Sequence, residues 1–143
     1  MGKIYRRIAT IAGKRIKKSK PGTPSSRYER GKLAENTARK YLQKNGLVPL
    51  QQNYRGPGGE IDLIMMDRNI IVFIEVRYRA SQHYLHPVES IDTGKRHRII
   101  QTGQYFLQVS DWKPDIQCRF DVVTVTGDLM KPELGWIKNA FQA

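Results

Sequence analysis

The chain has 143 residues, of which 39% are hydrophobic, and a formal net charge of +12. This length suits one domain, and no apolar stretch is long enough for a membrane helix or a secretion signal. The single cysteine, Cys118, excludes an internal disulfide and a multi-cysteine zinc site. We interpret it as a small buried side chain of a cytoplasmic protein.

The basic charge is concentrated near the N-terminus. Residues 1–28 hold nine basic side chains and no acidic one, which leaves +3 for the rest of the chain. Residues 20–26 have the Pro, Gly, Ser and Thr content of a linker. We therefore expect a disordered basic arm over residues 1–26 and a folded domain over 27–143. Such an arm attracts nucleic acid, although many basic arms are solvated and have no specific partner.

A helix is expected directly after the arm. Ser26 and Glu29 have the spacing of a capping box, and Gly46 is suited to end the helix. Between them, apolar residues recur at helical spacing at Leu33, Ala34, Ala38, Tyr41 and Leu42. Residues 47–54 are interpreted either as a short strand or as an extended lead-in.

The middle of the chain predicts two adjacent strands. Residues 56–59 form a Gly- and Pro-rich turn before a strand over 60–66, and residues 67–69 are a connection of hairpin length. The following strand, 70–77, begins with five consecutive apolar residues. Such a run is typical of a strand covered on both faces, and therefore central in its sheet.

The second half predicts one more helix and one or two strands. After a loop over 80–88, a helix begins near Asp92 or Thr93 and directs inward Ile99, Ile100, Gly103, Phe106 and Leu107. Residues 119–125 are a strand candidate, and residues 136–141 form a closing strand or a helical turn. This order of elements predicts a mixed α/β domain with helices packed on a small central sheet.

The candidate chemistry lies on the two central strands. Glu60 and Asp62 share one face of their strand, and Glu75 and Arg77 share one face of the next. A tight hairpin brings Asp62 and Glu75 together near its open end. Clustered carboxylates repel one another unless a cation lies among them, and their oxygens favour Mg²⁺, with Mn²⁺ as a substitute. With Arg77 next to a phosphate, this arrangement suits phosphodiester hydrolysis.

A plainer interpretation of the same residues is a set of cross-strand salt bridges on a solvated sheet face, which would include Arg79. The feature that favours a functional site is Glu75, because it is a charged residue at the end of a strand expected to be buried, where an unpaired charge is costly.

Two motifs carry a family resemblance: Gly58-Gly59-Glu60-Ile61-Asp62-Leu63-Ile64 and Phe73-Ile74-Glu75-Val76-Arg77-Tyr78-Arg79. They resemble the YraN family of small bacterial proteins, which has the restriction-endonuclease-like fold and the PD-(D/E)XK nuclease pattern and is related to archaeal Holliday-junction resolvases. The resemblance runs from about Lys32 to the C-terminus and includes Ala34-Glu35 and residues 118–123. Residues 1–28 lie outside it.

The resemblance implies that Asp62 and Glu75 bind a metal ion together with the main-chain carbonyl of Val76. It also implies that Glu35 completes the site. From the helical pattern alone, Glu35 lies at the edge of the apolar face, so it either leans toward the sheet or is an ordinary exposed carboxylate. The implied activity is Mg²⁺-dependent cleavage of DNA, including branched DNA, by a cytoplasmic protein that acts as a dimer.

One position departs from the family pattern, since Arg77 replaces its final lysine. Arginine stays charged and does not act as a base, so the substitution keeps a phosphate-binding role and puts turnover in doubt. Further phosphate-binding candidates are Arg79 on the strand and the basic start of the second helix, with Lys95, Arg96 and Arg98; a solvated helix face explains the latter almost as well. His83 and His86 are interpreted as exposed loop residues, and Asp121 as an ion-pair partner at a sheet edge.

Three functional hypotheses follow. The first is a metal-dependent endonuclease with Asp62 and Glu75 as ligands. The second is a nucleic-acid-binding module of the same fold that lost turnover when arginine took position 77. The third is an interaction protein whose basic arm docks on an acidic partner.

Overall fold

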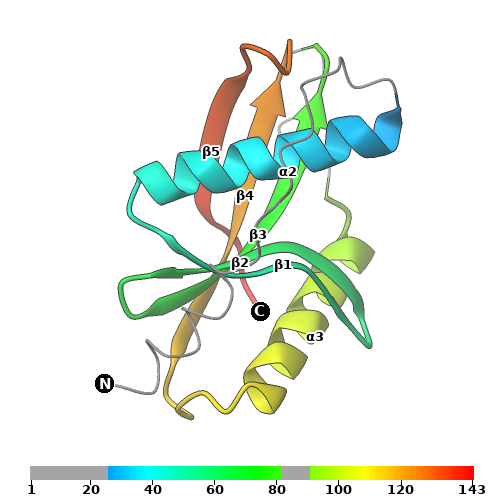
Figure 1. The fold of residues 1–143 in the computed structure, drawn as a ribbon. Coiled ribbons are helices and arrows are strands. Elements are labelled where there is room, and N and C mark those ends of the chain that lie inside the picture. Colours follow the sequence, from blue (N-terminus) through cyan, green and yellow to red (C-terminus); the bar gives the residue numbers. More distant parts are fainter. Residues whose placement is uncertain (1–25, 82–90) are drawn as a thin grey trace.

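A computed structural model describes residues 26–81 and 91–143 (Figure 1). The described elements, in chain order, are α2 (Arg27–Lys44), β1 (Val48–Gly56), β2 (Gly59–Asp67), β3 (Ile70–Arg79), α3 (Thr93–Val109), β4 (Gln117–Thr126) and β5 (Glu133–Phe141). The expected disordered arm, apart from Ser26, lies outside the described residues, and so do His83 and His86.

The five strands form one mixed sheet in the order β1-β2-β3-β4-β5. Three neighbouring pairs are antiparallel, whereas β3 and β4 are parallel. Parallel neighbours need a crossover connection, and α3 lies within the one that joins β3 to β4. The prediction of an α/β domain with a mixed sheet between helices is therefore confirmed, and β3 is the central strand, as its apolar run predicts.

Each face of the sheet carries its own hydrophobic cluster. Along β3, Ile71 and Phe73 belong to the cluster beneath α3, whereas Val72 and Ile74 belong to the cluster beneath α2. Because successive side chains of a strand point to opposite faces, the two helices cover opposite sides of the sheet (Figure 1). This arrangement buries β3 on both faces.

The helix ends follow the capping residues of the sequence. Ser26 Oγ accepts the N–H of Glu29, the Glu29 carboxylate accepts the N–H of Ser26, and Gly46 follows the helix with φ of +94°. Asp92 caps α3, where its Oδ1 accepts the N–H of Lys95 at 2.7 Å. The predicted ends of the first helix and the predicted start of the second are therefore confirmed. Neither described helix combines the length and apolar character needed to cross a membrane.

Two ambiguous segments are strands, β1 over the predicted 47–54 region and β5 over the C-terminal one. The interpretation of Cys118 as a buried residue is wrong, since its side chain is exposed. The pairing of β4 with β5 begins only at Phe120, so Cys118 lies on a part of β4 that β5 leaves uncovered. The ion-pair role predicted for Asp121 is confirmed, but Asp121 is fully buried on an inner strand and not at a sheet edge.

Candidate active site

The site lies where β2 and β3 separate. Their pairing runs from the hairpin turn as far as Leu63 and Ile74. Beyond that point β2 stays paired with β1 and β3 stays paired with β4, so a gap opens between the two central strands. Asp62 occupies this gap, and its Oδ2 accepts the main-chain N–H of Val76 at 2.8 Å. A carboxylate thus takes the place of a strand carbonyl.

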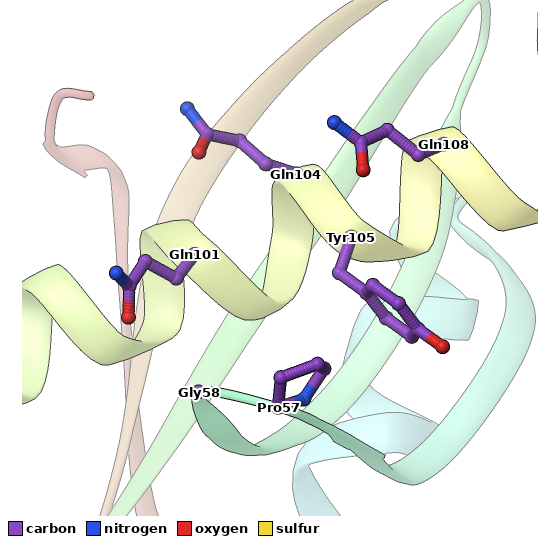
Figure 2. Close-up of a pocket in the computed structure, with 6 residues that line it drawn as sticks. All are labelled: Pro57, Gly58, Gln101, Gln104, Tyr105 and Gln108. Atoms are coloured by element: carbon purple, nitrogen blue, oxygen red, sulfur yellow. The ribbon is translucent and has the colours of Figure 1, made fainter.

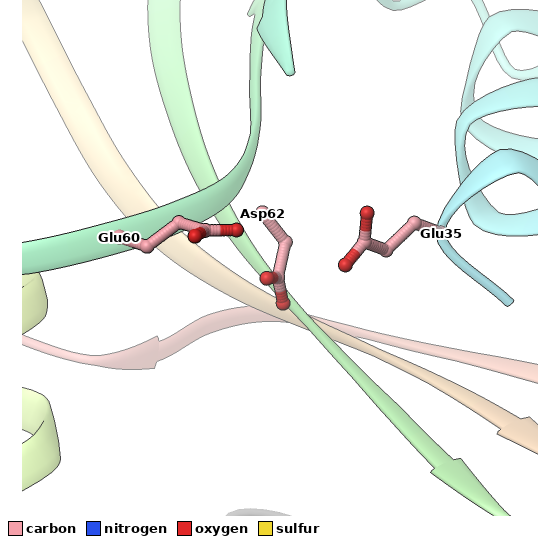
Figure 3. A group of neighbouring side chains, drawn as sticks. All are labelled: Glu35, Glu60 and Asp62. Atoms are coloured by element: carbon pink, nitrogen blue, oxygen red, sulfur yellow. The ribbon is translucent and has the colours of Figure 1, made fainter. Parts of the chain in front are cut away.

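Three carboxylates meet at this gap. Ligand oxygens of Glu35, Glu60 and Asp62 all lie within 4.8 Å of one another. Figure 3 shows Glu35 reaching from α2 toward the two β2 residues. Of the two alternatives for Glu35, the structure therefore has it leaning toward the sheet. Its Oε2 is buried without a hydrogen-bond partner, and the ammonium of Lys32 lies 3.6 Å away.

Glu60 is the more open member of the group. Its side chain is 35% exposed, and its Oε2 accepts a hydrogen bond of 3.2 Å from Nε of Arg55, its cross-strand neighbour. Each carboxylate has two oxygens, so this pairing leaves the other oxygen of Glu60 for a further partner.

Glu75 contributes a fourth carboxylate, paired with two cations. Only 5% of its side chain is exposed, and its Oε1 lies 2.5 Å from Nζ of Lys95 and 3.6 Å from Nε of Arg77. The same carboxyl group interacts electrostatically with that of Asp62. Nε of Arg77 is buried and has no hydrogen-bond partner. One side of the site thus offers acceptors, and the other offers charged donors.

The crowding changes the protonation of Asp62. The pKa of Asp62 is raised from 3.8 to about 8. Burial is the largest cause and the negative charges of Glu75 and Glu35 add to it, whereas the hydrogen bond from Val76 acts in the opposite direction. A carboxyl group with this pKa is largely protonated at neutral pH unless a cation is present. Clustered acids that hold a proton for lack of a cation are suited to binding one.

The residues fit a hard divalent cation. All the acceptors are carboxylate oxygens, which Mg²⁺ and Mn²⁺ prefer. The buried Oε2 of Glu35 has no hydrogen-bond partner and would gain one from such an ion. The three grouped residues are Glu35, Glu60 and Asp62, whereas Glu75 contacts the group through Asp62. The strand pattern predicts that Glu60 lies beside the site but gives it no role as a ligand.

The remaining candidates have different environments. Lys95, expected to bind phosphate, contacts Glu75. Arg79 lies half-buried on β3, two residues after Arg77. Arg96 points elsewhere: its Nε donates to the carbonyl of Ile91, and its guanidinium lies 6.0 Å from the ring centre of Phe141. The sequence pattern did not predict the contact between Lys95 and Glu75. It did place Lys95 in the first turn of the helix, because Asp92 is the capping residue.

Two helices on a mixed sheet, with carboxylates gathered where two central strands separate, define an α/β domain with a candidate cation site. The chain belongs to the family described as "Uncharacterised protein family UPF0102", whose sequence model matches residues 34–125. This match confirms the family resemblance of the two motifs. The matched segment contains all four carboxylates of the site and Lys95.

Individual relatives match over most of their length. A UPF0102 protein of Coxiella burnetii (strain CbuK_Q154) is 47% identical over 109 residues, which cover 76% of this chain and 88% of the relative. A UPF0102 protein of Nitrosococcus oceani is 40% identical over 119 residues, which cover 83% of this chain and 96% of the relative. The similarity therefore extends over most of the described fold as well as the two motifs.

Proposed function

We propose that this protein is a divalent-metal-dependent endonuclease that hydrolyses phosphodiesters in DNA, including branched or otherwise structured DNA. The observation that carries the proposal is the group formed by Glu35, Glu60 and Asp62, whose oxygens lie within 4.8 Å of one another. Two basic side chains adjoin this group through Glu75. The net charge of +12 supports a polyanionic substrate.

The acceptor side of the site would hold the cation. Asp62 is fixed by the N–H of Val76, and Glu35 contributes a buried oxygen that accepts no hydrogen bond. Glu75 stays a predicted ligand, since both of its cations contact Oε1 and its carboxyl group adjoins Asp62. A divalent cation bound here would lower the pKa of a water molecule and neutralise charge on the phosphate.

The donor side would bind the phosphate. Arg77 has a buried Nε–H that makes no hydrogen bond, and an arginine donates to phosphate oxygens with a fixed geometry. Lys95 would add a second positive charge at the same point. Both groups stabilise negative charge that develops on the phosphate during attack by water. A cytoplasmic location and a dimer on DNA belong to the same proposal and rest on the cysteine content and the family resemblance.

One observation favours an alternative function. Arg77 stands where the family pattern has lysine, and a guanidinium does not deprotonate water. The second candidate is therefore a nucleic-acid-binding protein that has kept the cation and phosphate contacts without turnover. It differs from the first only in the absence of cleavage.

The decisive experiment compares the protein with its Asp62→Asn variant on labelled single-stranded, duplex, flap and four-way-junction DNA, each with Mg²⁺, Mn²⁺ or EDTA. We expect cleavage by the wild type with metal and none by the variant. Asp115→Asn is a matched control, because Asp115 is exposed and lies outside the group, and it should cleave normally.

Calorimetric titration with Mn²⁺ provides a readout besides activity. Heat of binding by the wild type and by Asp115→Asn, with a clear loss in Asp62→Asn, is expected. Cleavage that persists in Asp62→Asn would overturn the nuclease proposal at this site. If the wild type binds DNA and Mn²⁺ but none of the three proteins cleaves DNA, the binding module is favoured. Arg77→Lys would then be tested for a gain of turnover.

A further inference from the structure

A groove lies along α3, outside the carboxylate site. Its volume is about 430 Å³, and it is lined by Pro57 and Gly58 of the β1–β2 turn and by Gln101, Gln104, Tyr105 and Gln108 of α3. Figure 2 shows the four helical side chains in sequence along α3, with the ring of Tyr105 next to Pro57. Proteins hold small organic groups in pockets of roughly 300–1,000 Å³. The groove therefore suits one unpaired nucleotide, and it is too small to enclose a duplex.

The chemistry of the lining favours a base over a phosphate. None of the six lining residues is charged. Glutamine amides both donate and accept hydrogen bonds, which matches the edges of nucleobases, and an aromatic ring offers a surface on which a base stacks. Tyr105 is 38% exposed, so part of its ring is available for such stacking.

The groove and the candidate active site lie on the same two elements. Glu60 lies two residues after Gly58 on the same hairpin, and Gln101 lies six residues after Lys95 on the same helix, about 9 Å along its axis. Exposed Arg98 lies between Lys95 and Gln101 in α3 and would meet a phosphate there. A DNA strand bound at the carboxylates would reach the groove over this short distance.

The two walls are packed together closely. A Cβ at Gly58 would come within 2.9 Å of the carbonyl oxygen of Arg98 and of Oγ1 of Thr102, and a Cβ at Gly56 would come within 3.0 Å of Cγ2 of Thr102. Glycine is what allows the hairpin to approach the helix this closely. The groove is thus a feature of the folded state and does not depend on a ligand to form.

We propose that this groove holds an unpaired nucleotide of the DNA strand that passes the carboxylate site, with its base stacked on Tyr105 and its edge bonded by the glutamine amides. This inference rests on the proposed function and narrows its substrate to DNA with a single-stranded part next to the cleaved bond, such as a flap, an overhang or an open junction.

The test measures binding in EDTA, so that no cleavage occurs. Fluorescence anisotropy would compare the full chain on a blunt duplex, on the same duplex with a thymidine overhang, and on one with an abasic overhang, which keeps the phosphates and lacks the bases. We expect wild type to bind the thymidine overhang most tightly. Tyr105→Ala should weaken that binding about tenfold and leave the blunt duplex unchanged.

Two further variants control the result. Tyr105→Phe keeps the ring and should retain the preference for the thymidine overhang, whereas Gln43→Ala, which changes an exposed glutamine at the far end of α2, should behave as wild type. Tyr105→Ala is expected to fold, because its side chain lies at the surface, and its melting temperature would verify this.

The groove and the nuclease proposals fail separately. Equal affinity of wild type for the blunt and overhang duplexes, absence of DNA binding, or an unchanged preference in Tyr105→Ala would overturn the groove assignment, even if Asp62-dependent cleavage is found. Conversely, the groove assignment is supported if wild type prefers the thymidine overhang to the abasic one and Tyr105→Ala loses this preference. This holds even if no metal gives cleavage.

Discussion

The main-chain N–H of Val76 donates a hydrogen bond of 2.8 Å to Oδ2 of Asp62 across the gap between β2 and β3. In a continuous antiparallel pair, a strand carbonyl accepts such a bond. Here the pairing stops at Leu63 and Ile74, and the carboxylate of Asp62 satisfies the donor. The irregularity of the sheet and the fixed position of the candidate ligand are therefore one and the same feature.

The raised pKa of Asp62 predicts how stability depends on pH in EDTA. The pKa is about 8 in the folded state and near 4 in an unfolded chain, so the folded state holds this proton more tightly. Its contribution to stability is complete below pH 4 and is lost as the pH rises through about 8. Asp62→Asn cannot ionise. We expect the melting temperature of wild type, relative to that of this variant, to fall as the pH rises from 5 to 9. If the melting temperatures of the two proteins change in parallel over this range, the pKa of Asp62 is not raised in the folded state.

The pairing of Glu75 with Lys95 predicts an asymmetric response to mutation. Lys95→Met keeps the aliphatic stem and removes the charge, which leaves the buried carboxylate of Glu75 with only its longer contact to Arg77. We expect a loss of about 1–3 kcal/mol in the free energy of unfolding, measured by urea denaturation. The double variant Glu75→Gln/Lys95→Met should recover part of this loss, because the buried side chain at position 75 then carries no charge.

A control for this pair is available on the hairpin. Arg55 also pairs with a carboxylate, that of Glu60, but its side chain is 84% exposed. Arg55→Met should therefore cost less than about 1 kcal/mol. Losses of equal size at Lys95 and Arg55 would show that burial does not strengthen the pair at Glu75.

The elements of the fold were predictable because their patterns are local. The capping residues of α2 and α3, the hairpin between β2 and β3, and the apolar run of β3 each depend on residues close together in sequence. The proximity of Asp62 and Glu75 followed from the hairpin alone, since residues at equal distances from a tight turn lie on neighbouring strands.

Other features of the site depend on contacts between distant segments. The strand pattern predicts that Glu60 and Asp62 share a face, but their grouping with Glu35 depends on how α2 packs on the sheet and has no local pattern. The contact of Lys95 with Glu75 joins two elements whose residues are 20 positions apart in the sequence. The exposure of Cys118 likewise depends on where β5 ends its pairing with β4.

A second buried carboxylate, Asp121, is predicted to have a structural role, since it is not one of the three grouped carboxylates. It is fully buried and accepts hydrogen bonds from Nε of Arg119, from Nε1 of Trp136 at 2.9 Å and from the N–H of Asn139 at 2.8 Å. Asn139 has φ of +52° and lies where the register of the β4–β5 pairing shifts, so the same bond also holds this irregularity of β5.

Replacing Asp121 by Asn should therefore lower stability by about 3 kcal/mol or more, because Arg119 loses a buried partner. Mn²⁺ binding, measured by calorimetry at a temperature where the variant is folded, should remain as in wild type. A variant of normal stability with impaired Mn²⁺ binding would instead make Asp121 part of the cation site.

Replacing either of two helical glycines by alanine is expected to change the melting temperature in opposite directions. At Gly31 in α2, a Cβ would meet nothing within 4 Å, whereas at Gly103 in α3 it would lie 3.1 Å from the ring of Phe73. Alanine favours a helix over glycine by roughly 0.5–1 kcal/mol, so Gly31→Ala should raise the melting temperature.

At Gly103 the same gain is opposed by steric overlap. The ring of Phe73 is buried and lies against the rings of Phe106 and Phe120, at centroid distances of 6.0 and 5.3 Å, so it has little room to move away from an added methyl group. Overpacking of this kind costs about 1–3 kcal/mol, more than the helical preference returns. Gly103→Ala should therefore lower the melting temperature while Gly31→Ala raises it. A rise in both variants would mean that α3 can shift outward from β3, and the groove that α3 forms with the hairpin would then have to change shape with it.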